Sequence, residues 1–244
     1  AEILNLKPML IPSRNVSGQK IEYINNLCLL SNTFHKIAEE VYTTSIEEYG
    51  EVAEGFKKGT VGSSTMPHKI NPKLSKGIIA NSQKLYSLSV PGYFSAARPF
   101  EADSTSYMLF DGLVEEALEL MTEVLLRAEE LTADLQINSK RMYENAQINK
   151  GLDNSEYIMM KIAEKIGKDK AHELVYDMAM ETEIGGQNYL DVLLQNELIS
   201  DLFSEMELIE LLDPKSYTGS SVDLAHDFSK KAKQLSKQVR AKYE

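Results

Sequence analysis

The chain has 244 residues, of which 26 are Lys or Arg and 37 are Asp or Glu, so its formal net charge is −11. This acidic balance argues against general binding to nucleic acid or to an anionic membrane surface. The single cysteine, Cys28, excludes an internal disulfide and a multi-cysteine zinc site, and 43% apolar residues exclude a disordered or collagen-like protein.

Membrane and targeting signals are missing from the sequence as given. No apolar run approaches the roughly 20 residues needed to span a bilayer, and no signal peptide is recognisable. We therefore expect a cytoplasmic protein that associates neither with membranes nor with nucleic acid. The chain opens with Ala1 rather than Met, as a processed start or part of a longer protein would.

Helical periodicity dominates the first 145 residues, whereas alternating β-branched runs typical of strands are scarce. The range 21–49 carries apolar residues at spacings of three and four, which predicts one long helix. A glycine-rich stretch follows and is incompatible with a regular helix. The range 101–132 carries a second long apolar stripe and predicts another long helix.

Between these two ranges the sequence predicts a helix over 72–90. Asn71 is a favourable N-cap residue and Pro72 a favourable first helical residue. Pro91 and Gly92 should end this helix.

The helices that the sequence predicts are shorter after residue 145. Asn154 and Ser155 should cap the first short helix, and Gly167 should end it. The predicted short helices cover 155–166, 169–184, 189–195 and 205–211, followed by a helical tail from 222 with a basic end. We therefore expect an all-α chain, with a long helical bundle over 1–145 and a small helical domain over 146–244.

The segment with the most chemical information covers 62–72 and reads Gly-Ser-Ser-Thr-Met-Pro-His-Lys-Ile-Asn-Pro. It leads into a helix N-terminus, where free N–H groups and the helix dipole favour an anion, and Lys69 adds a positive charge. These features indicate a site for a carboxylate or phosphate beside a serine. A serine acts as a base only if Lys69, N–H groups and the exclusion of water stabilise its alkoxide. A solvated loop followed by a helix cap is the alternative interpretation.

This segment resembles the signature loop of the fumarase/aspartase superfamily. The pattern of that superfamily, Gly-Ser-Ser-x-Met-Pro-x-Lys-x-Asn-Pro, is matched at every fixed position, and the whole predicted loop covers 59–72. Thr65 and His68 look most like the adenylosuccinate lyase and carboxymuconate cycloisomerase branch. The range 21–60 resembles the bundle helix before the loop, and 150–228 resembles the C-terminal domain of adenylosuccinate lyases.

The resemblance implies a reaction and roles for residues of the loop. Members of the superfamily eliminate fumarate by removing a proton next to a carboxylate and protonating the leaving group. The resemblance implies that Ser63 is the catalytic base and that Lys69 and Asn71 hold the substrate carboxylate and its developing charge. Further substrate contacts are implied for Ser64, Thr65 and Met66. It implies no cofactor and no metal.

The resemblance also implies an assembly. Bundles of four subunits pack into one core in this superfamily, so 1–145 should be part of a tetramer-forming central domain with active sites shared between subunits. These enzymes are about twice as long as this chain, and their acid histidine lies before the bundle helix. We therefore expect a C-terminal half that is inactive alone.

A second departure concerns the residues that hold a nucleotide phosphate. Adenylosuccinate lyases carry an arginine and serine pattern after the loop helix, and here Arg98 is present whereas Ser106 stands near the place of the second arginine. Glu101 and Asp103 would repel a phosphate. Other sources of positive charge are Arg14 and Lys20.

Three hypotheses follow. The first is an adenylosuccinate-lyase-like enzyme that releases fumarate, with AMP as the other product. The second is a carboxymuconate-cycloisomerase-like or other superfamily enzyme acting on a non-nucleotide polycarboxylate, which the altered phosphate segment favours. The third is a catalytically silent helical assembly protein, against which the intact Ser63, Lys69 and Asn71 argue.

Overall fold

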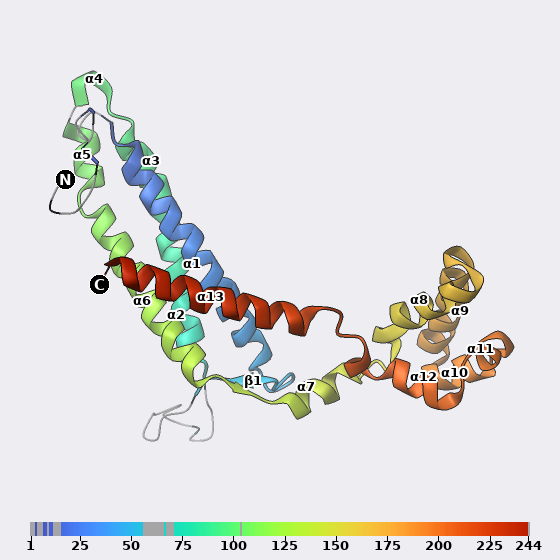
Figure 1. The fold of residues 1–244 in the computed structure, drawn as a ribbon. Helices are drawn as coiled ribbons and strands as arrows, with labels where there is room; N and C mark the ends of the chain where they lie inside the picture. The colour runs from blue at the N-terminus through green and yellow to red at the C-terminus, as the bar shows by residue number, and fades with distance from the viewer. Residues whose placement is uncertain are drawn as a thin grey trace. The chain divides into compact units, whose positions relative to one another are not determined.

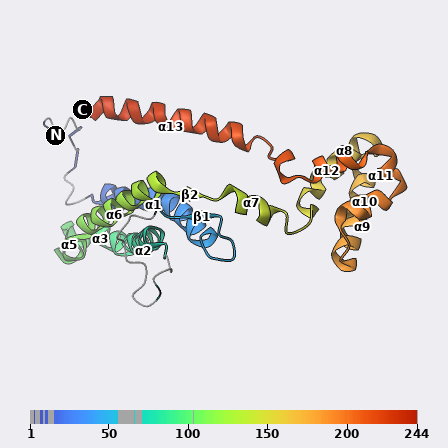
Figure 2. The same ribbon diagram turned by 90° about the horizontal axis from the view of Figure 1, so that it is seen from below.

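The computed structural model describes residues 3, 7–8, 10–11, 16–55, 66, 71–102 and 104–243 (Figures 1 and 2). It confirms the all-α prediction. The chain divides into two compact units, Ala1–Arg141 and Met142–Glu244, each with its own apolar core.

The first unit is a bundle of long helices lying side by side. Its members are α1 (Gly18–Thr44), α2 (Lys73–Ser87) with its continuation α3 (Ser89–Ala96), and α6 (Leu113–Asp134) (Figure 1). Buried residues at helical spacing form one strip along the helices. They include Ile24, Ala38, Ile78, Leu85, Ala117, Val124 and Leu131.

Helices α1 and α2–α3 run in opposite directions. The Asn25 side chain donates to Tyr93 Oη on α3 at 2.8 Å, whereas Ser31 Oγ, further along α1, donates to Ser82 Oγ on α2 at 2.8 Å. The end of α3 therefore lies beside the start of α1, and the start of α2 lies toward the end of α1.

The predicted helix end at Pro91 and Gly92 is wrong. The helix breaks at Leu88 and resumes as α3 through both residues. Pro91 falls in the first turn of α3, where a helix does not use the backbone N–H that proline lacks. Gly92 lies tightly against the end of the Ile21 side chain, which would have to shift to make room for a larger residue.

The single helix predicted over 101–132 is divided in the structure. It begins with the segment α4 (Pro99–Ala102), in which Phe100 and Glu101 have positive φ values of 51° and 58°, and with the short helix α5 (Ser104–Phe110). Gly112 separates these from α6. Gly112 has a φ of +76°, a left-handed conformation that glycine adopts without strain. The apolar period continued through this break, so the pattern did not reveal it.

Two short strands were not expected from the sequence. β1 (Val52–Ala53) pairs antiparallel with β2 (Gln136–Ile137), with Val52 opposite Ile137. The pair joins the chain just after α1 to the chain just after α6. Two residues are too few to produce a strand period that sequence alone could reveal.

The second unit is built from short helices, and α7 (Ser139–Ala146) crosses the boundary into it. The predictions over 155–166, 169–184, 189–195 and 205–211 are confirmed. The corresponding helices are α8 (Ser155–Ile166), α9 (Lys168–Gly185), α10 (Tyr189–Gln195) and α12 (Glu205–Leu212), and the sequence missed α11 (Glu197–Leu202). Two 3₁₀ turns, Leu152–Asn154 and Pro214–Ser216, complete the unit.

The predicted cap of α8 by Asn154 is wrong. Asn154 is at the N-cap position, but its side chain makes no cap hydrogen bond. Its Nδ2 instead donates to the carbonyl oxygens of Leu211 and Asp213, both at 2.9 Å. The amide therefore ties the start of α8 to the end of α12.

The predicted helical tail is confirmed as α13 (Ser221–Tyr243), and its side chains through Lys242 are exposed. Across the described ranges, none of the helices combines the length and the apolar character that crossing a membrane requires.

Candidate functional site

Most of the loop residues selected from the sequence lie outside the described part of the chain. Ser63, Ser64, Thr65 and Lys69 belong to this group. Met66 and Asn71 are described: Met66 is 43% exposed and Asn71 is half-buried. The structure therefore informs the site through the residues that flank the loop.

Glu54 joins the two flanks of this segment. One oxygen of its carboxylate accepts the backbone N–H of Leu74 at 2.9 Å, and the other accepts both the N–H and the Oγ–H of Ser75 at 2.7 Å. These two N–H groups belong to the first turn of α2, where a helix has no partners of its own. A residue before the loop therefore caps the helix after it.

This arrangement corrects two expectations. The N-cap position of α2 is Pro72 rather than Asn71, and it supplies no side-chain cap. The helix N-terminus that was expected to attract a substrate anion already holds the carboxylate of Glu54. A second carboxylate would be repelled from the same N–H groups.

Glu54 is itself held by its neighbours. Ala53 before it is in β1, which pairs with β2, and Gly55 after it lies against Asp134 at the end of α6. A Cβ on Gly55 would lie 2.8 Å from the carbonyl oxygen of Asp134 and closer still to its side chain. Sequence reasoning missed Glu54 because its partners are 20 and 21 residues away. No signal in the sequence pointed to this contact, because Asn71 was the expected source of the capping side chain.

Arg98 lies in a different environment, after α3. Its guanidinium carbon is 5.2 Å from the ring centre of Tyr107, and Nε donates to the carbonyl of Ser95 at 3.4 Å. Lys20, at the start of α1, places Nζ 4.3 Å from the ring centre of Phe110. Tyr107 and Phe110 are three residues apart on α5, so both cations lie against one short helix.

The charge of Arg98 acts on the nearby Lys20. Burial lowers the pKa of Lys20, and the positive charge of Arg98 lowers it further. Lys20 was one of the two alternative sources of positive charge in the sequence, and the structure places it beside Arg98. The other, Arg14, lies outside the described residues.

Arg98 and the loop flanks lie at opposite ends of the bundle. Between them run the 15 residues of α2 and the eight of α3, which at 1.5 Å per residue correspond to about 22 Å and about 12 Å. Figure 1 shows α4 and α5 at one end of the bundle and β1 with the start of α2 at the other. The flanks of the loop and Arg98 of one chain therefore lie far apart.

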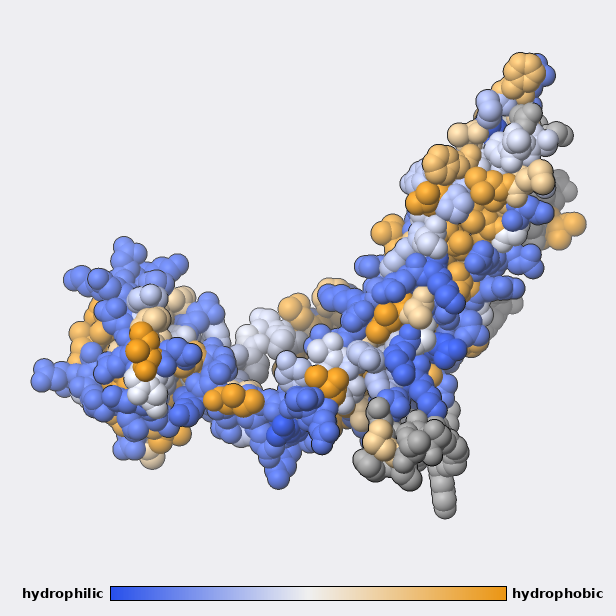
Figure 3. Space-filling model, turned by 180° about the vertical axis from the view of Figure 1, so that it is seen from behind, coloured by the Kyte–Doolittle hydropathy of each residue, from blue (hydrophilic) through white to orange (hydrophobic). Residues whose placement is uncertain are grey.

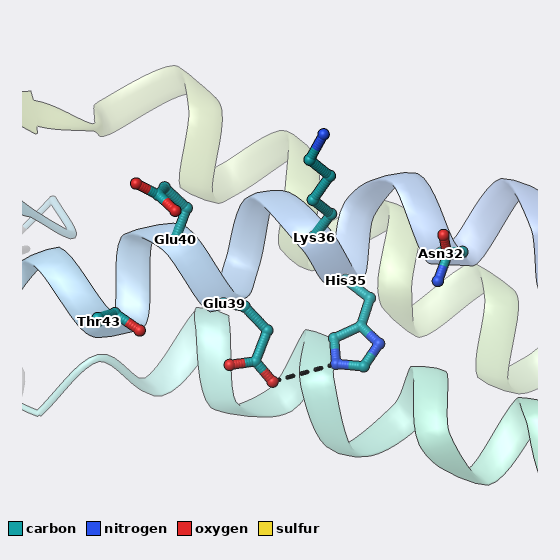
Figure 4. A pocket seen from close by; sticks show the side chains of 6 residues that line it. All are labelled: Asn32, His35, Lys36, Glu39, Glu40 and Thr43. Atoms are coloured by element: carbon teal, nitrogen blue, oxygen red, sulfur yellow. Dashed lines mark hydrogen bonds and ion pairs between the residues drawn. The ribbon is translucent and has the colours of Figure 1, made fainter.

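A polar hollow of about 390 Å³ lies on α1 and is lined by Asn32, His35, Lys36, Glu39, Glu40 and Thr43 (Figure 4). His35 Nε2 is 3.2 Å from Glu39 Oε1, and its Nδ1 is 3.1 Å from Tyr86 Oη. In Figure 4 His35 and Glu39 point toward α2, whereas Lys36 and Glu40 point away from it. The groups diverge, so they do not form a common binding site.

Metal coordination finds no support in the described ranges, where no three His, Cys, Asp or Glu side chains gather in a way that would hold an ion.

Two family models match the chain. One is described as "Lyase" and covers residues 15–84, and the other as "Adenylosuccinate lyase C-terminus" and covers 151–228. Adenylosuccinate lyase of Archaeoglobus fulgidus is 31% identical over 221 residues, which are 90% of this chain and 50% of that protein. N-acetyl-S-(2-succino)cysteine lyase of Enterococcus italicus is 30% identical over 221 residues, 91% of this chain and 49% of that protein.

Solved structures agree with these matches. The 3-carboxy-cis,cis-muconate lactonizing enzyme of Pseudomonas putida superposes with a TM-score of 0.80 at 25% identity, covering 90% of this chain and 49% of the other. The chain thus spans about half the length of the curated relatives it matches.

Proposed function

The chain belongs to the fumarase/aspartase superfamily of lyases, and we propose that it forms part of an enzyme that releases fumarate from a succinylated substrate by β-elimination. The observation that carries the proposal is the match of residues 62–72 to every fixed position of the superfamily's loop. Two similar proteins, adenylosuccinate lyase and N-acetyl-S-(2-succino)cysteine lyase, are named for succinylated substrates, which supports this substrate class.

The proposed chemistry assigns a role to each loop residue. Ser63 removes a proton from the carbon next to a carboxylate, and the electron pair of that bond moves into the carboxylate. Lys69 and Asn71 hold this carboxylate as its negative charge increases. The pair then forms the double bond of fumarate as the bond to the leaving group breaks, and an acid protonates that group. Ser64, Thr65 and Met66 supply further contacts.

The proposed active site is shared between copies of the chain. Arg98 and the loop flanks lie at opposite ends of one bundle, so a site that uses both needs at least two chains. A homotetramer in which bundles pack side by side satisfies this requirement. We further place the enzyme in the cytoplasm, so cell fractionation should recover it with cytoplasmic markers.

Adenylosuccinate is the first candidate substrate, because it is named by one family model and by several relatives. If adenylosuccinate is the substrate, Arg98 and Lys20 together attract its phosphate, and Lys20 supplies the positive charge of the missing second arginine. A non-nucleotide polycarboxylate is the second candidate. Two observations favour it: Glu101 lies close to Arg98 in sequence, and enzymes named for carboxymuconate match in sequence and structure.

The test is a fumarate-release assay on the full-length gene product. The substrates are adenylosuccinate, N-acetyl-S-(2-succino)cysteine and, by loss of substrate, 3-carboxy-cis,cis-muconate. Each is run with wild-type protein, with Ser63→Ala and with Ser45→Ala, which alters a serine after α1. Loss of a positioned base should lower turnover roughly 100- to 10,000-fold in Ser63→Ala alone.

Each outcome selects one hypothesis. Serine-dependent release from adenylosuccinate establishes the nucleotide substrate, and release from the cysteine derivative or loss of the muconate establishes the second candidate. Equal turnover in Ser63→Ala and wild type contradicts the assignment of Ser63. A folded tetramer without turnover on any substrate indicates a silent assembly protein.

A further inference from the structure

We propose that Glu54 is a positioning residue for the elimination: its carboxylate sets the place of Asn71, at the point where the loop rejoins the bundle. This inference rests on the proposed function. It adds a residue outside the signature loop whose action is indirect, through the backbone that carries Asn71.

The contact is strong because one carboxylate accepts three hydrogen bonds. Its donors are the N–H groups of Leu74 and Ser75 and the hydroxyl of Ser75, at distances of 2.7 to 2.9 Å. Ser75 is fully buried, which shields its two donors from water, whereas Glu54 and Leu74 are half-buried. Hydrogen bonds to an ionised acceptor are roughly twice as strong as those between neutral groups.

Little freedom remains between this contact and Asn71. Only Pro72 and Lys73 separate Asn71 from Leu74, and the proline ring fixes the φ of Pro72 near its observed −71°. On the other side, Gly55 lies against Asp134, so Glu54 is anchored to the end of α6. The position of Asn71 is thus linked, through Glu54 and Gly55, to the end of α6.

The same carboxylate also restricts where the substrate binds. It occupies the positive end of α2 that would otherwise hold an anion. In the proposed reaction the substrate carboxylate is therefore left to the side chains of Lys69 and Asn71, which can follow its change in charge. Glu54 thereby keeps the substrate carboxylate away from the start of α2, so that it binds to the reacting side chains instead.

The test compares Glu54→Gln with Glu47→Gln in the full-length protein. Both remove one negative charge, but Glu47 is exposed before β1. Glutamine at 54 keeps one acceptor and turns an NH₂ group toward an N–H donor. Because misplacement of about 1 Å costs roughly 100-fold, we expect kcat per folded site to fall roughly 10- to 100-fold in Glu54→Gln, with KM changing less than about threefold. Glu47→Gln should change neither.

Two further measurements separate positioning from a loss of fold. Amide hydrogen exchange at Leu74 and Ser75 should become at least about tenfold faster in Glu54→Gln, while Ile78 and Leu85 keep their protection. In Glu54→Ala, added acetate should restore part of kcat by occupying the vacated place. Acetate should restore nothing in Ser63→Ala.

The outcomes distinguish this inference from the function it rests on. Wild-type turnover together with an unchanged kcat in Glu54→Gln contradicts the positioning role and leaves the lyase intact. A lower yield of folded protein with normal kcat per folded site also contradicts it, because Glu54 would then serve the fold alone. Absence of wild-type turnover on every substrate overturns both the function and the role.

Discussion

The two units of the chain bury their apolar residues in different ways. In the bundle, buried residues form a strip along the helices, and large apolar residues remain on the outside. Leu29 is 70% exposed, Phe94 66% and Leu126 58%. Figure 3 shows apolar residues gathered over the half of the bundle that ends in α4 and α5.

The second unit closes its core around side chains that converge from several helices. Ile158, Ile162, Tyr189, Leu193, Ile199 and Leu208 are fully buried there. Asn154 ties the start of α8 to the end of α12, and a capping box of Ser204 and Glu207 closes the start of α12. Outside α13, most of its apolar side chains pack within the unit.

Apart from α13, the difference agrees with the proposed assembly, in which the first unit packs against other copies of the chain. A contiguous exposed apolar surface on a water-soluble protein marks an interaction surface. The same unit carries Arg98 and the flanks of the proposed loop, at its two opposite ends. Assembly and catalysis are therefore expected to depend on the same unit.

The largest expected effect tests the shared site directly. Ser63 belongs to the loop whose flanks lie at one end of the bundle, and Arg98 lies at the other end. Because both residues have a role in the proposed site, Ser63→Ala or Arg98→Ala alone should leave the enzyme nearly inactive on adenylosuccinate. When both variants are co-expressed, mixed tetramers should contain sites with an intact serine and an intact arginine. Random mixing predicts about one quarter of wild-type activity.

Co-expression of Ser63→Ala with Lys69→Ala provides the control. These two substitutions affect the same loop, so every loop in the mixed tetramer carries one defect and no activity should return. Equal recovery in both pairs would contradict the sharing of sites between chains.

The second prediction compares the exposed surfaces of the two units. Leu29→Asp puts a charge on the bundle, and Met206→Asp puts one on α12, where the methionine is 80% exposed. Because a buried charge without a partner costs several kcal/mol, Leu29→Asp should reduce the assembly to smaller particles. Light scattering should find Met206→Asp unchanged, and equal behaviour of the two variants would contradict the difference between the units.

The third prediction concerns the internal ties of the second unit. Asn154→Ala removes the donor for the carbonyls of Leu211 and Asp213, at an expected cost of roughly 2 to 3 kcal/mol. Asn149→Ala removes only an exposed contact to Asp153 and should cost about 0.5 kcal/mol or less. Denaturant unfolding measures both, and equal midpoints would show that the Asn154 amide does not stabilise the unit.

Sequence reasoning predicted what depends on local pattern. The pattern over 169–184 predicted α9, and that over 21–49 predicted α1, although α1 ends at Thr44. Gly167 ends α8 with a φ of +86°, as expected. Pattern gave no warning of the break at Gly112, because the apolar stripe continues on both sides of it. Pro91 was misjudged because its effect depends on where in a helix it falls.

The candidate site shows the same division. The loop is recognisable because its residues are consecutive, whereas Glu54 acts on Leu74 and Ser75 through tertiary structure. Likewise, Lys20 meets Arg98 only because α1 and α3 run in opposite directions. Contacts of this kind depend on how the helices pack, and the local spacing of residues in one sequence does not reveal that packing.

The smallest expected effect also belongs to the second unit and concerns Tyr189. Its side chain is fully buried, and within the described residues its hydroxyl has no hydrogen-bond partner. Tyr189→Phe removes a buried polar group without leaving a large cavity, so it should stabilise the unit by about 1 kcal/mol. Tyr176→Phe, at an exposed tyrosine, should change the free energy of unfolding by less than about 0.5 kcal/mol.

The pH dependence of the free energy of unfolding separates the effect of the Tyr189 hydroxyl from any change in packing. Burial raises the pKa of Tyr189 well above its usual value, so the unfolded chain loses this proton at a lower pH than the folded chain. Below pH ~10 both forms are protonated, and above it the stability of the wild type should fall by up to about 1.4 kcal/mol per pH unit. This component of the fall should be absent in Tyr189→Phe and present in Tyr176→Phe. Parallel curves for all three proteins would show that the hydroxyl finds a partner or water in solution, and the core of the second unit would then be less closed than its contacts indicate.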